Sequence, residues 1–293
     1  MGVCYLEQYL NILKTILKTG VRKENRTGID TIAIAGVMFE HDMSDGFPIL
    51  TTKSVPFKLV SSELEFFIKG KTDKKWLQDR NNHIWDEWCN PQIVPYGHDD
   101  ETKQRMFEER DLGPIYGFQW RHFNASYLGF DFDYTGFGVD QLENVVKKLK
   151  TNPNDRRMIV SAWNPSFISE MALPPCHYGF QVTVIDDKLN LLWNQRSVDS
   201  VLGLPFNIAS YGLLLHLLSK ESGFKEGKLI GFLADTHIYV NHLDGVEEQL
   251  SRKPLSLPLV ETKPFNSIFD WEYIHSKIVD YNHHPRIKFE IAI

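Results

Sequence analysis

Apolar residues at helical spacing predict the first two helices of the chain. Leucines recur every three or four residues from Leu6 to Leu17, and Gly20 follows them as a stop signal. A second apolar stripe predicts a helix over residues 57–69, and Glu63 lies on or beside that stripe. The chain therefore opens with amphipathic helices separated by a polar loop.

Strand patterns dominate after a third predicted helix. Asp140 can cap this helix, whose apolar positions run from Leu142 to Leu149. Asp186-Asp187 has the composition of a tight turn, which joins the strands on either side of it into a hairpin. The predicted strands cover residues 158–163, 180–185 and 189–193, and a buried helix is predicted over 210–218.

Helices and strands mix without internal repeats and without the regular alternation of a doubly wound fold. This mixture predicts an α+β protein built on one large sheet. Residues 90–110 are charged and have little apolar periodicity, so they are interpreted as an exposed insertion within a single domain spanning residues 1–293.

Composition narrows the function classes. The 293 residues are 42% hydrophobic, enough for a substantial core, and the net charge of −6 offers no basic surface for duplex nucleic acid. No apolar run approaches the ~20 residues that cross a bilayer, and the N-terminal residues do not resemble a secretory signal. We expect a cytoplasmic protein that does not bind membranes.

Cysteine and histidine spacing argues against a disulfide framework or a metal site. The three cysteines are far apart and form no CxxC pair. The eleven histidines include no HExxH motif, and His237 and His242 are five residues apart. We therefore predict no metal.

The segment LPPCHYGF is the strongest candidate for chemistry. Pro174 and Pro175 fix the backbone directly before Cys176, so a rigid turn presents the thiol beside His177. A lone cysteine is often only a small buried hydrophobic residue. A nucleophilic cysteine requires positive charge nearby to favour the thiolate, and both interpretations remain open on this segment alone.

Arginines near predicted strand ends could supply that charge. Arg156 and Arg157 precede one strand, and Arg196 follows another. Arginine is usually a solvated surface residue, but its planar guanidinium is also suited to bidentate phosphate recognition.

Polar residues within apolar surroundings suggest a nucleotide site. Asn207 offers both a donor and an acceptor, which matches a pyrimidine edge carrying one carbonyl and one N–H, although a structural amide would look the same. His237 and Tyr239 alternate along a strand and share a face, where they could hold a sugar hydroxyl. Trp85 and Trp88 are three residues apart and are equally compatible with a core or a ligand wall.

Taken together, these segments resemble the thymidylate synthase family across nearly the whole chain. The resemblance implies one domain on a large twisted mixed β-sheet flanked by helices, and a homodimer packed through the sheets. The motifs in family order are NRTG, FPILTTK, ELEFF, HIWDEW, DLGPIYGFQWRHF, DRRMIVSAWNP, ALPPCH, QRSVDSVLGLPFNIASY, DTHIYVNH and IKFEIAI.

The resemblance implies a methyltransferase that converts dUMP to dTMP with 5,10-methylenetetrahydrofolate as one-carbon and hydride donor. Cys176 would attack C6 of the nucleotide, and Asn207 would bind the uracil edge. Glu63 would organise proton transfers through water, supported by His177 and Tyr116. The other residues implied for dUMP are Arg26, Arg196, Ser197, Asp199, His237 and Tyr239, with Arg156 and Arg157 from the partner subunit.

The same resemblance implies a reduced-folate site, with Asp199 bonded to the pterin and Ala292 in a tail that closes over the ligands. The remaining folate residues implied are Lys53, Ile84, Trp85, Trp88, Leu202 and Gly203. Ser54 and Pro56 replace a basic residue and a histidine found in relatives, which weakens the expected contact with the glutamyl tail. Glu65 replaces a leucine, and helical spacing directs it away from Glu63, so it is expected to be solvated.

Two alternatives stay open at this point. A deoxyuridylate hydroxymethylase would add water instead of hydride to the same methylene intermediate. A non-catalytic RNA-binding relative would share the fold, although the acidic composition makes nucleic acid an unfavourable partner.

Overall fold

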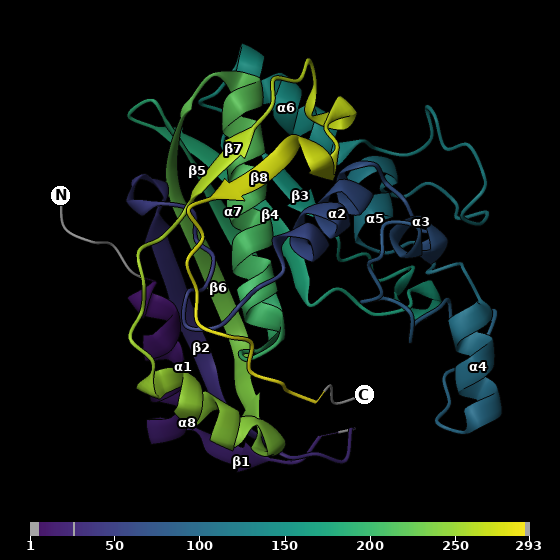
Figure 1. The fold of residues 1–293 in the computed structure, drawn as a ribbon. Helices are drawn as coiled ribbons and strands as arrows, with labels where there is room; N and C mark the ends of the chain where they lie inside the picture. The colour runs from purple at the N-terminus through teal and green to yellow at the C-terminus, as the bar shows by residue number, and fades with distance from the viewer. Residues whose placement is uncertain (1–5, 26, 291–293) are drawn as a thin grey trace.

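A six-stranded mixed sheet organises the protein. The computed structural model describes residues 6–25 and 27–290. The strand order is β1-β2-β6-β5-β4-β3, and every neighbouring pair is antiparallel except the parallel pair β5 and β6 (Figure 1). The strands are β1 Val21–Lys23, β2 Thr31–Asp42, β3 Ile159–Ser161, β4 His177–Ile185, β5 Lys188–Asp199 and β6 Lys225–Tyr239. The predicted α+β class with a large mixed sheet is confirmed.

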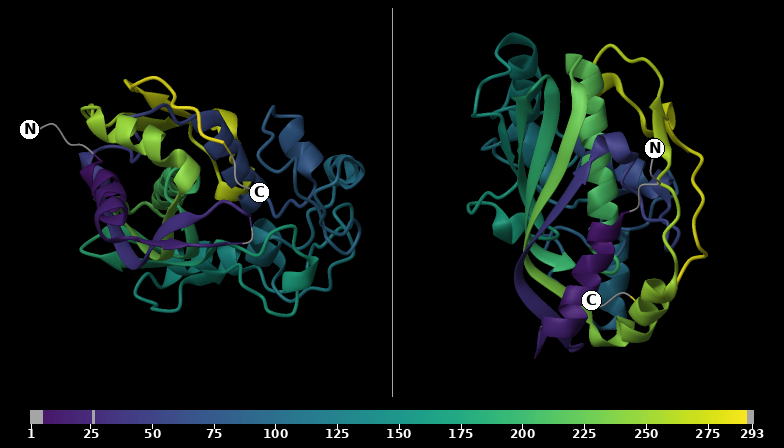
Figure 2. Two further views of the ribbon diagram at one scale, coloured as in Figure 1. Left: turned by 90° about the horizontal axis from the view of Figure 1, so that it is seen from below. Right: turned by 90° about the vertical axis from the view of Figure 1, so that its left-hand side faces the viewer.

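Helices α1 and α7 pack on the same side of this sheet (Figure 2). α7 is the central helix, and residues along all of its turns are buried. The helices are α1 Glu7–Thr19, α2 Phe57–Ile68, α3 Lys74–Gln78, α4 Asp100–Glu108, α5 Tyr116–His122, α6 Gln141–Thr151, α7 Gly203–Ser222 and α8 Leu243–Ser251. None of the helices within the described ranges is long and apolar enough to cross a bilayer.

A two-stranded ribbon and short 3₁₀ turns complete the fold. The ribbon pairs β7 Leu259–Thr262 with β8 Ser276–Val279, and the chain then runs back across the molecule toward the sheet's other end (Figure 1). The 3₁₀ turns are η1 Met43–Asp45, η2 Ile168–Glu170, η3 Val240–His242, η4 Ile268–Asp270 and η5 Tyr273–His275.

Local signals fixed several boundaries as predicted. Asp140 caps α6, because its side chain accepts the Glu143 N–H. Asp186 and Asp187 have φ values of 52° and 56°, the left-handed geometry that a two-residue hairpin turn requires, so the predicted hairpin of β4 and β5 is confirmed.

Several strand and helix boundaries were predicted wrongly. β4 begins at His177, three residues before the predicted start at 180. β5 extends to Asp199, so Arg196 lies inside a strand and does not follow one. α7 begins at Gly203, seven residues before the predicted start at 210. Polar residues in its first turns concealed the helix, while Pro205 is tolerated there because first-turn N–H groups have no helical partner.

Glu65 is the clearest correction. It was expected to be solvated, but only 1% of it is exposed. Its carboxylate pairs with Lys69 at 2.6 Å and accepts the backbone N–H of Tyr273 at 3.0 Å. The face of α2 opposite Glu63 is covered by the C-terminal part of the chain, which helical spacing alone does not reveal.

The segment 90–110 contains structure that its composition did not predict. Asp99 caps α4, most of which is exposed, while Met106 is buried against Cys89 and Val94. The assignment of this segment as an insertion within one domain stays a prediction.

Candidate active site

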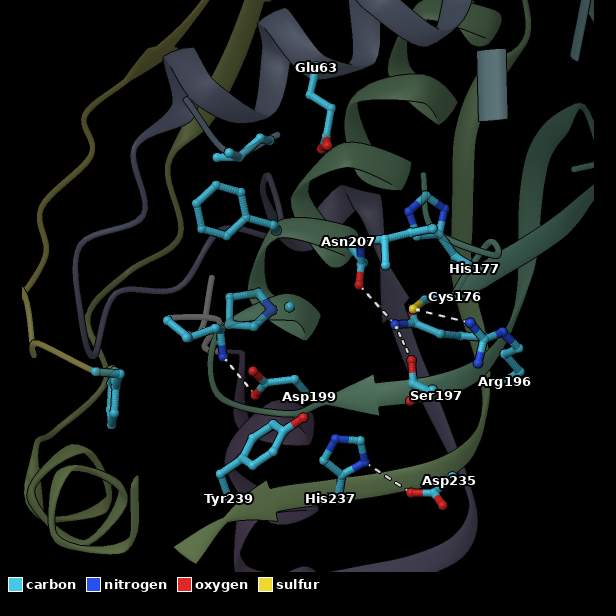
Figure 3. Close-up of a pocket in the computed structure, with 18 of the residues that line it drawn as sticks. Glu63, Cys176, His177, Arg196, Ser197, Asp199, Asn207, Asp235, His237 and Tyr239 are labelled. Atoms are coloured by element: carbon cyan, nitrogen blue, oxygen red, sulfur yellow. Dashed lines mark hydrogen bonds and ion pairs between the residues drawn. The ribbon is translucent and has the colours of Figure 1, made fainter. Parts of the chain in front are cut away.

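A cavity of about 1090 Å³ gathers most of the predicted site residues. Glu63 enters it from α2, and His237 and Tyr239 enter from β6 on the opposite side (Figure 3). The predicted residues that line it are Cys176, Glu63, His177, Tyr116, Asn207, Arg196, Ser197, Asp199, His237, Tyr239, Lys53, Ile84, Trp85, Trp88, Leu202 and Gly203.

Cys176 lies directly before β4, with a guanidinium beside it. Nη2 of Arg196 lies 3.9 Å from Sγ of Cys176 (Figure 3). The carbonyls of Pro174 and Pro175 accept hydrogen bonds from the same guanidinium at 2.7 and 2.9 Å, and the Cys176 N–H donates to the Tyr116 hydroxyl at 2.8 Å. The two prolines thus hold the positive charge where it favours a thiolate.

His177 is held as a neutral ring. Its Nδ1 lies 2.9 Å from the Tyr211 hydroxyl, and its ring stacks on Tyr116 at a centroid distance of 4.4 Å. Burial lowers the pKa of His177 to about 3, and burial also raises the pKa of Tyr116 well above its usual value. These groups can donate or accept hydrogen bonds without carrying charge at neutral pH.

Glu63 has the protonation behaviour of an acid–base group. Trp85 Nε1 donates to its carboxylate at 2.8 Å. Burial nevertheless raises the pKa of Glu63 to about 7, so the carboxyl can give or take a proton near neutral pH.

The amide of Asn207 is oriented by a residue that sequence reasoning missed. Gln195 Nε2 donates to Asn207 Oδ1 at 2.9 Å, and Gln195 Oε1 accepts from Trp193 Nε1 at 3.1 Å. Asn207 therefore keeps its amide N–H groups and one oxygen lone pair for a ligand. Gln195 is a polar residue at a buried strand position, which is the signal that could have identified it.

A second missed residue, Asp235, orients His237. Its carboxylate lies 2.9 Å from His237 Nδ1 and 2.5 Å from Lys23 Nζ. Burial alone would raise the pKa of Asp235, but these two hydrogen bonds bring it below its ordinary value. Because Nδ1 is bonded to Asp235, His237 keeps Nε2 for a ligand, and its ring lies beside the Tyr239 ring at a centroid distance of 5.3 Å.

The other end of the cavity is an apolar wall with one buried cation. Ile84, Trp85 and Trp88 line it together with Leu202 and Gly203. Lys53 Nζ donates to the Val201 carbonyl at 2.6 Å, and burial lowers the pKa of Lys53 to about 8. Asp199 Oδ1 accepts the N–H groups of Val201 and Leu202 at 2.8 and 3.0 Å, which holds this turn in place.

Four predicted residues are not brought into this cavity by the described chain. Arg156 and Arg157 are exposed ahead of β3 and do not line it. Arg26 and Ala292 lie outside the described residues. Arg286 and Phe289, which were not predicted, line the cavity from the C-terminal segment.

No group of three or more histidine, cysteine or acidic side chains that could hold a metal ion occurs in residues 6–25 and 27–290. A cysteine beside a fixed guanidinium, a carboxyl with a pKa near 7 and an oriented amide meet in one cavity. This combination has the chemistry of an enzyme site that can recognise a ligand through hydrogen bonds and hold it beside a thiol.

Comparison with known proteins identifies the family. The sequence profile described as "Thymidylate synthase" matches residues 7–293. A thymidylate synthase of Mycoplasma mobile is 44% identical over 98% of this chain and 100% of its own length. The chain belongs to the thymidylate synthase family.

Two longer relatives are also similar. The bifunctional dihydrofolate reductase-thymidylate synthases of Paramecium tetraurelia and Leishmania major are 42% and 43% identical over 98% of this chain. The chain spans only 61% and 55% of their respective lengths.

Proposed function

We propose that this protein converts dUMP and 5,10-methylenetetrahydrofolate to dTMP and dihydrofolate. The observation that carries the proposal is the contact of 3.9 Å between the Cys176 thiol and the Arg196 guanidinium inside the cavity. Family membership supports the same reaction.

In the proposed first step, the Cys176 thiolate forms a bond to C6 of the uracil. The electron pair of the C5–C6 double bond moves to C5 and is stabilised through O4, where the Asn207 amide donates a hydrogen bond. C5 then forms a bond to the methylene carbon of the reduced folate, while one of that carbon's two C–N bonds breaks and its electron pair stays on the folate nitrogen. Glu63, with a pKa of about 7, is suited to accept the C5 proton through water.

Completion of the proposed reaction requires elimination and reduction. Loss of the C5 proton allows the folate nitrogen to leave and gives an exocyclic methylene. A hydride from the folate reduces that methylene to methyl, the C6–S bond breaks, and the folate departs as dihydrofolate. The apolar wall of Trp85 and Trp88 would keep water from the methylene carbon.

Ligand placement follows from the two ends of the cavity. We assign Arg196 and Ser197 to the 5′-phosphate and His237 with Tyr239 to the ribose 3′-hydroxyl. The folate would lie on the wall of Ile84, Trp85 and Trp88, with Asp199 at its pterin and Lys53 toward its glutamate. Arg26 and Ala292 keep their roles as predictions.

A homodimer with shared active sites is part of the proposal. Met38 and Phe232 are register partners on β2 and β6 and are 52% and 44% exposed, and Ile159 on β3 is 52% exposed. Apolar side chains exposed on a sheet face favour association with a second copy. Arg156 and Arg157 would then reach the partner's phosphate site. Cytoplasmic location and the absence of a nucleic-acid partner stay predictions from composition.

Adduct trapping tests the proposed chemistry. 5-Fluoro-dUMP has no C5 proton to lose, so with methylenetetrahydrofolate it should leave a stable adduct on Cys176, detected by intact mass and peptide mapping. Cys176→Ser should form none. An adduct on Cys89, or no adduct on active wild-type protein, would contradict the mechanism.

The co-product distinguishes the alternatives. A thymidylate synthase releases dihydrofolate, whereas a deoxyuridylate hydroxymethylase releases tetrahydrofolate. Turnover with tetrahydrofolate would favour the hydroxymethylase. Salt-dependent RNA affinity without any turnover would favour the RNA-binding alternative.

A further inference from the structure

Lys74, on α3, is a buried lysine whose ammonium group donates to three backbone carbonyls. Its exposed fraction is 1%. Nζ donates to the carbonyls of Asp86, Trp88 and Met106 at 3.0, 3.0 and 2.6 Å. An ammonium has three N–H donors, so all of them are used. Within the described chain no carboxylate lies at ion-pair distance from Nζ, although the charges of Asp86 and Glu109 are near enough to favour the ammonium form. Direct contact with the ammonium group is therefore made by the three carbonyls.

The three carbonyls belong to two segments, which also pack together through Cys89 and Met106. Asp86 and Trp88 belong to the turn, closed by the hydrogen bond from the Trp88 N–H to the Trp85 carbonyl, that carries the indoles of Trp85 and Trp88 into the cavity. Met106 belongs to α4, in the charged segment 90–110. Lys74 therefore ties the wall of the cavity to α3 and to α4 at one point.

The two indoles give this attachment a consequence for the site. Trp85 Nε1 donates to Glu63 at 2.8 Å, and the Trp88 ring stacks on Tyr96 at a centroid distance of 5.8 Å. A shift of the backbone between residues 86 and 88 would move both rings. The Cys176–Arg196 contact is built on β4, β5 and the preceding prolines, so it does not depend on this turn.

We propose that Lys74 is a positioning residue for the folate site, acting through the three carbonyls that set the Trp85–Trp88 wall. The segment 90–110 is thereby part of the support of that wall. This inference rests on the proposed function, because the proposed function assigns the wall of Trp85 and Trp88 to the folate.

Substitution separates this role from a general effect on folding. Lys74→Ala should raise the KM for methylenetetrahydrofolate about tenfold, as expected for a misplaced binding surface. Its affinity for dUMP, measured by equilibrium dialysis without folate, should stay within about twofold of wild type. Lys75→Ala is the matched control, because Lys75 is the next residue of α3 and pairs only with exposed Asp79.

Chemical rescue supplies the decisive measurement. The atoms lost in Lys74→Ala correspond to n-propylammonium, which can occupy the vacated space and donate to the same carbonyls. Added n-propylammonium should lower the folate KM of Lys74→Ala toward the wild-type value, while 1-propanol, which has one O–H donor and no charge, should not. Lys75→Ala should not respond to either.

Two outcomes would overturn the inference while leaving the proposed function intact. One is an unchanged folate KM in a folded Lys74→Ala protein. The other is a loss of dUMP affinity equal to the loss of folate affinity, which would indicate a general structural role. Failure of the wild-type protein to turn over or to trap 5-fluoro-dUMP would instead contradict the proposed function.

Discussion

Asn207 lines the cavity with its amide already oriented, because Gln195 Nε2 donates a hydrogen bond to its Oδ1. Replacing Asn207 by Asp keeps an oxygen for Gln195 and presents a second oxygen to the base. That oxygen would accept from a cytosine 4-amino group and would repel a uracil carbonyl.

Asn207→Asp should therefore shift base preference from dUMP toward dCMP. A mismatched buried hydrogen bond costs about 1–3 kcal/mol, so the ratio of kcat/KM values for the two nucleotides should change by roughly tenfold or more. Rates measured with both nucleotides test this, and Asn207→Ala serves as a control that removes both polarities. An unchanged ratio would exclude Asn207 from base recognition.

Glu63 predicts a pH-dependent contribution to stability. Burial raises its pKa from 4.5 to about 7, so the fold favours the protonated carboxyl. The contribution of Glu63 to the free energy of unfolding is fully present below pH 4.5 and is lost as pH rises through 7. The full shift corresponds to at most about 3 kcal/mol, and access to the open cavity reduces it.

Urea unfolding of wild type and Glu63→Gln at pH 5 and pH 8 measures this effect. From pH 5 to pH 8, the unfolding free energy of Glu63→Gln should rise by about 2 kcal/mol relative to that of wild type. The same substitution should abolish catalytic activity. Glu247→Gln, at an exposed position of α8, should show no such gain. A constant difference between wild type and Glu63→Gln would show that the carboxyl titrates normally.

At the scale of elements, Glu65 joins α2 to the segment at η5. Lys69→Met would leave the buried Glu65 carboxylate without a cation, which typically lowers the free energy of unfolding by about 3–5 kcal/mol. Glu65→Gln keeps an oxygen for the Tyr273 N–H and should cost less, about 1–2 kcal/mol.

Denaturant unfolding checks this order. The exposed pair Lys75 and Asp79 is the reference, and Lys75→Met should change stability by less than about 1 kcal/mol. If Lys69→Met were as mild as Lys75→Met, Glu65 would behave as the solvated residue that helical spacing alone suggests.

For the whole molecule, the proposed dimer predicts complementation between two inactive chains. Cys176→Ser lacks the nucleophile but can lend its arginines, whereas Arg156→Ala/Arg157→Ala keeps the thiol. In a mixed dimer one site carries both defects and the other carries neither. Random reassortment makes about half of the dimers mixed, so activity should recover toward roughly a quarter of wild type.

Mild denaturation and refolding of an equal mixture performs this test, with native mass spectrometry to verify mixed dimers. Each variant refolded alone is the control and should stay severely impaired. Mixed dimers without activity would mean that the arginines act within their own chain, and the role of Cys176 would be unaffected.

The amino-acid sequence by itself determined the local features of this protein. The Asp140 cap, the Asp186-Asp187 turn and the Pro174-Pro175 constraint each depend on neighbouring residues, so short-range chemistry predicts them. The set of site residues came from the order of the motifs, which carries the family resemblance and most of the cavity lining.

Only the tertiary structure decided which distant residues support those groups. Gln195 behind Asn207, Asp235 behind His237 and the burial of Glu65 depend on strands and segments brought together from far apart in the chain. Lys74 likewise looks like any helical surface lysine until its ammonium is seen among three carbonyls. The physical reason is that burial and hydrogen-bond partners are properties of packing, which local sequence periodicity does not specify.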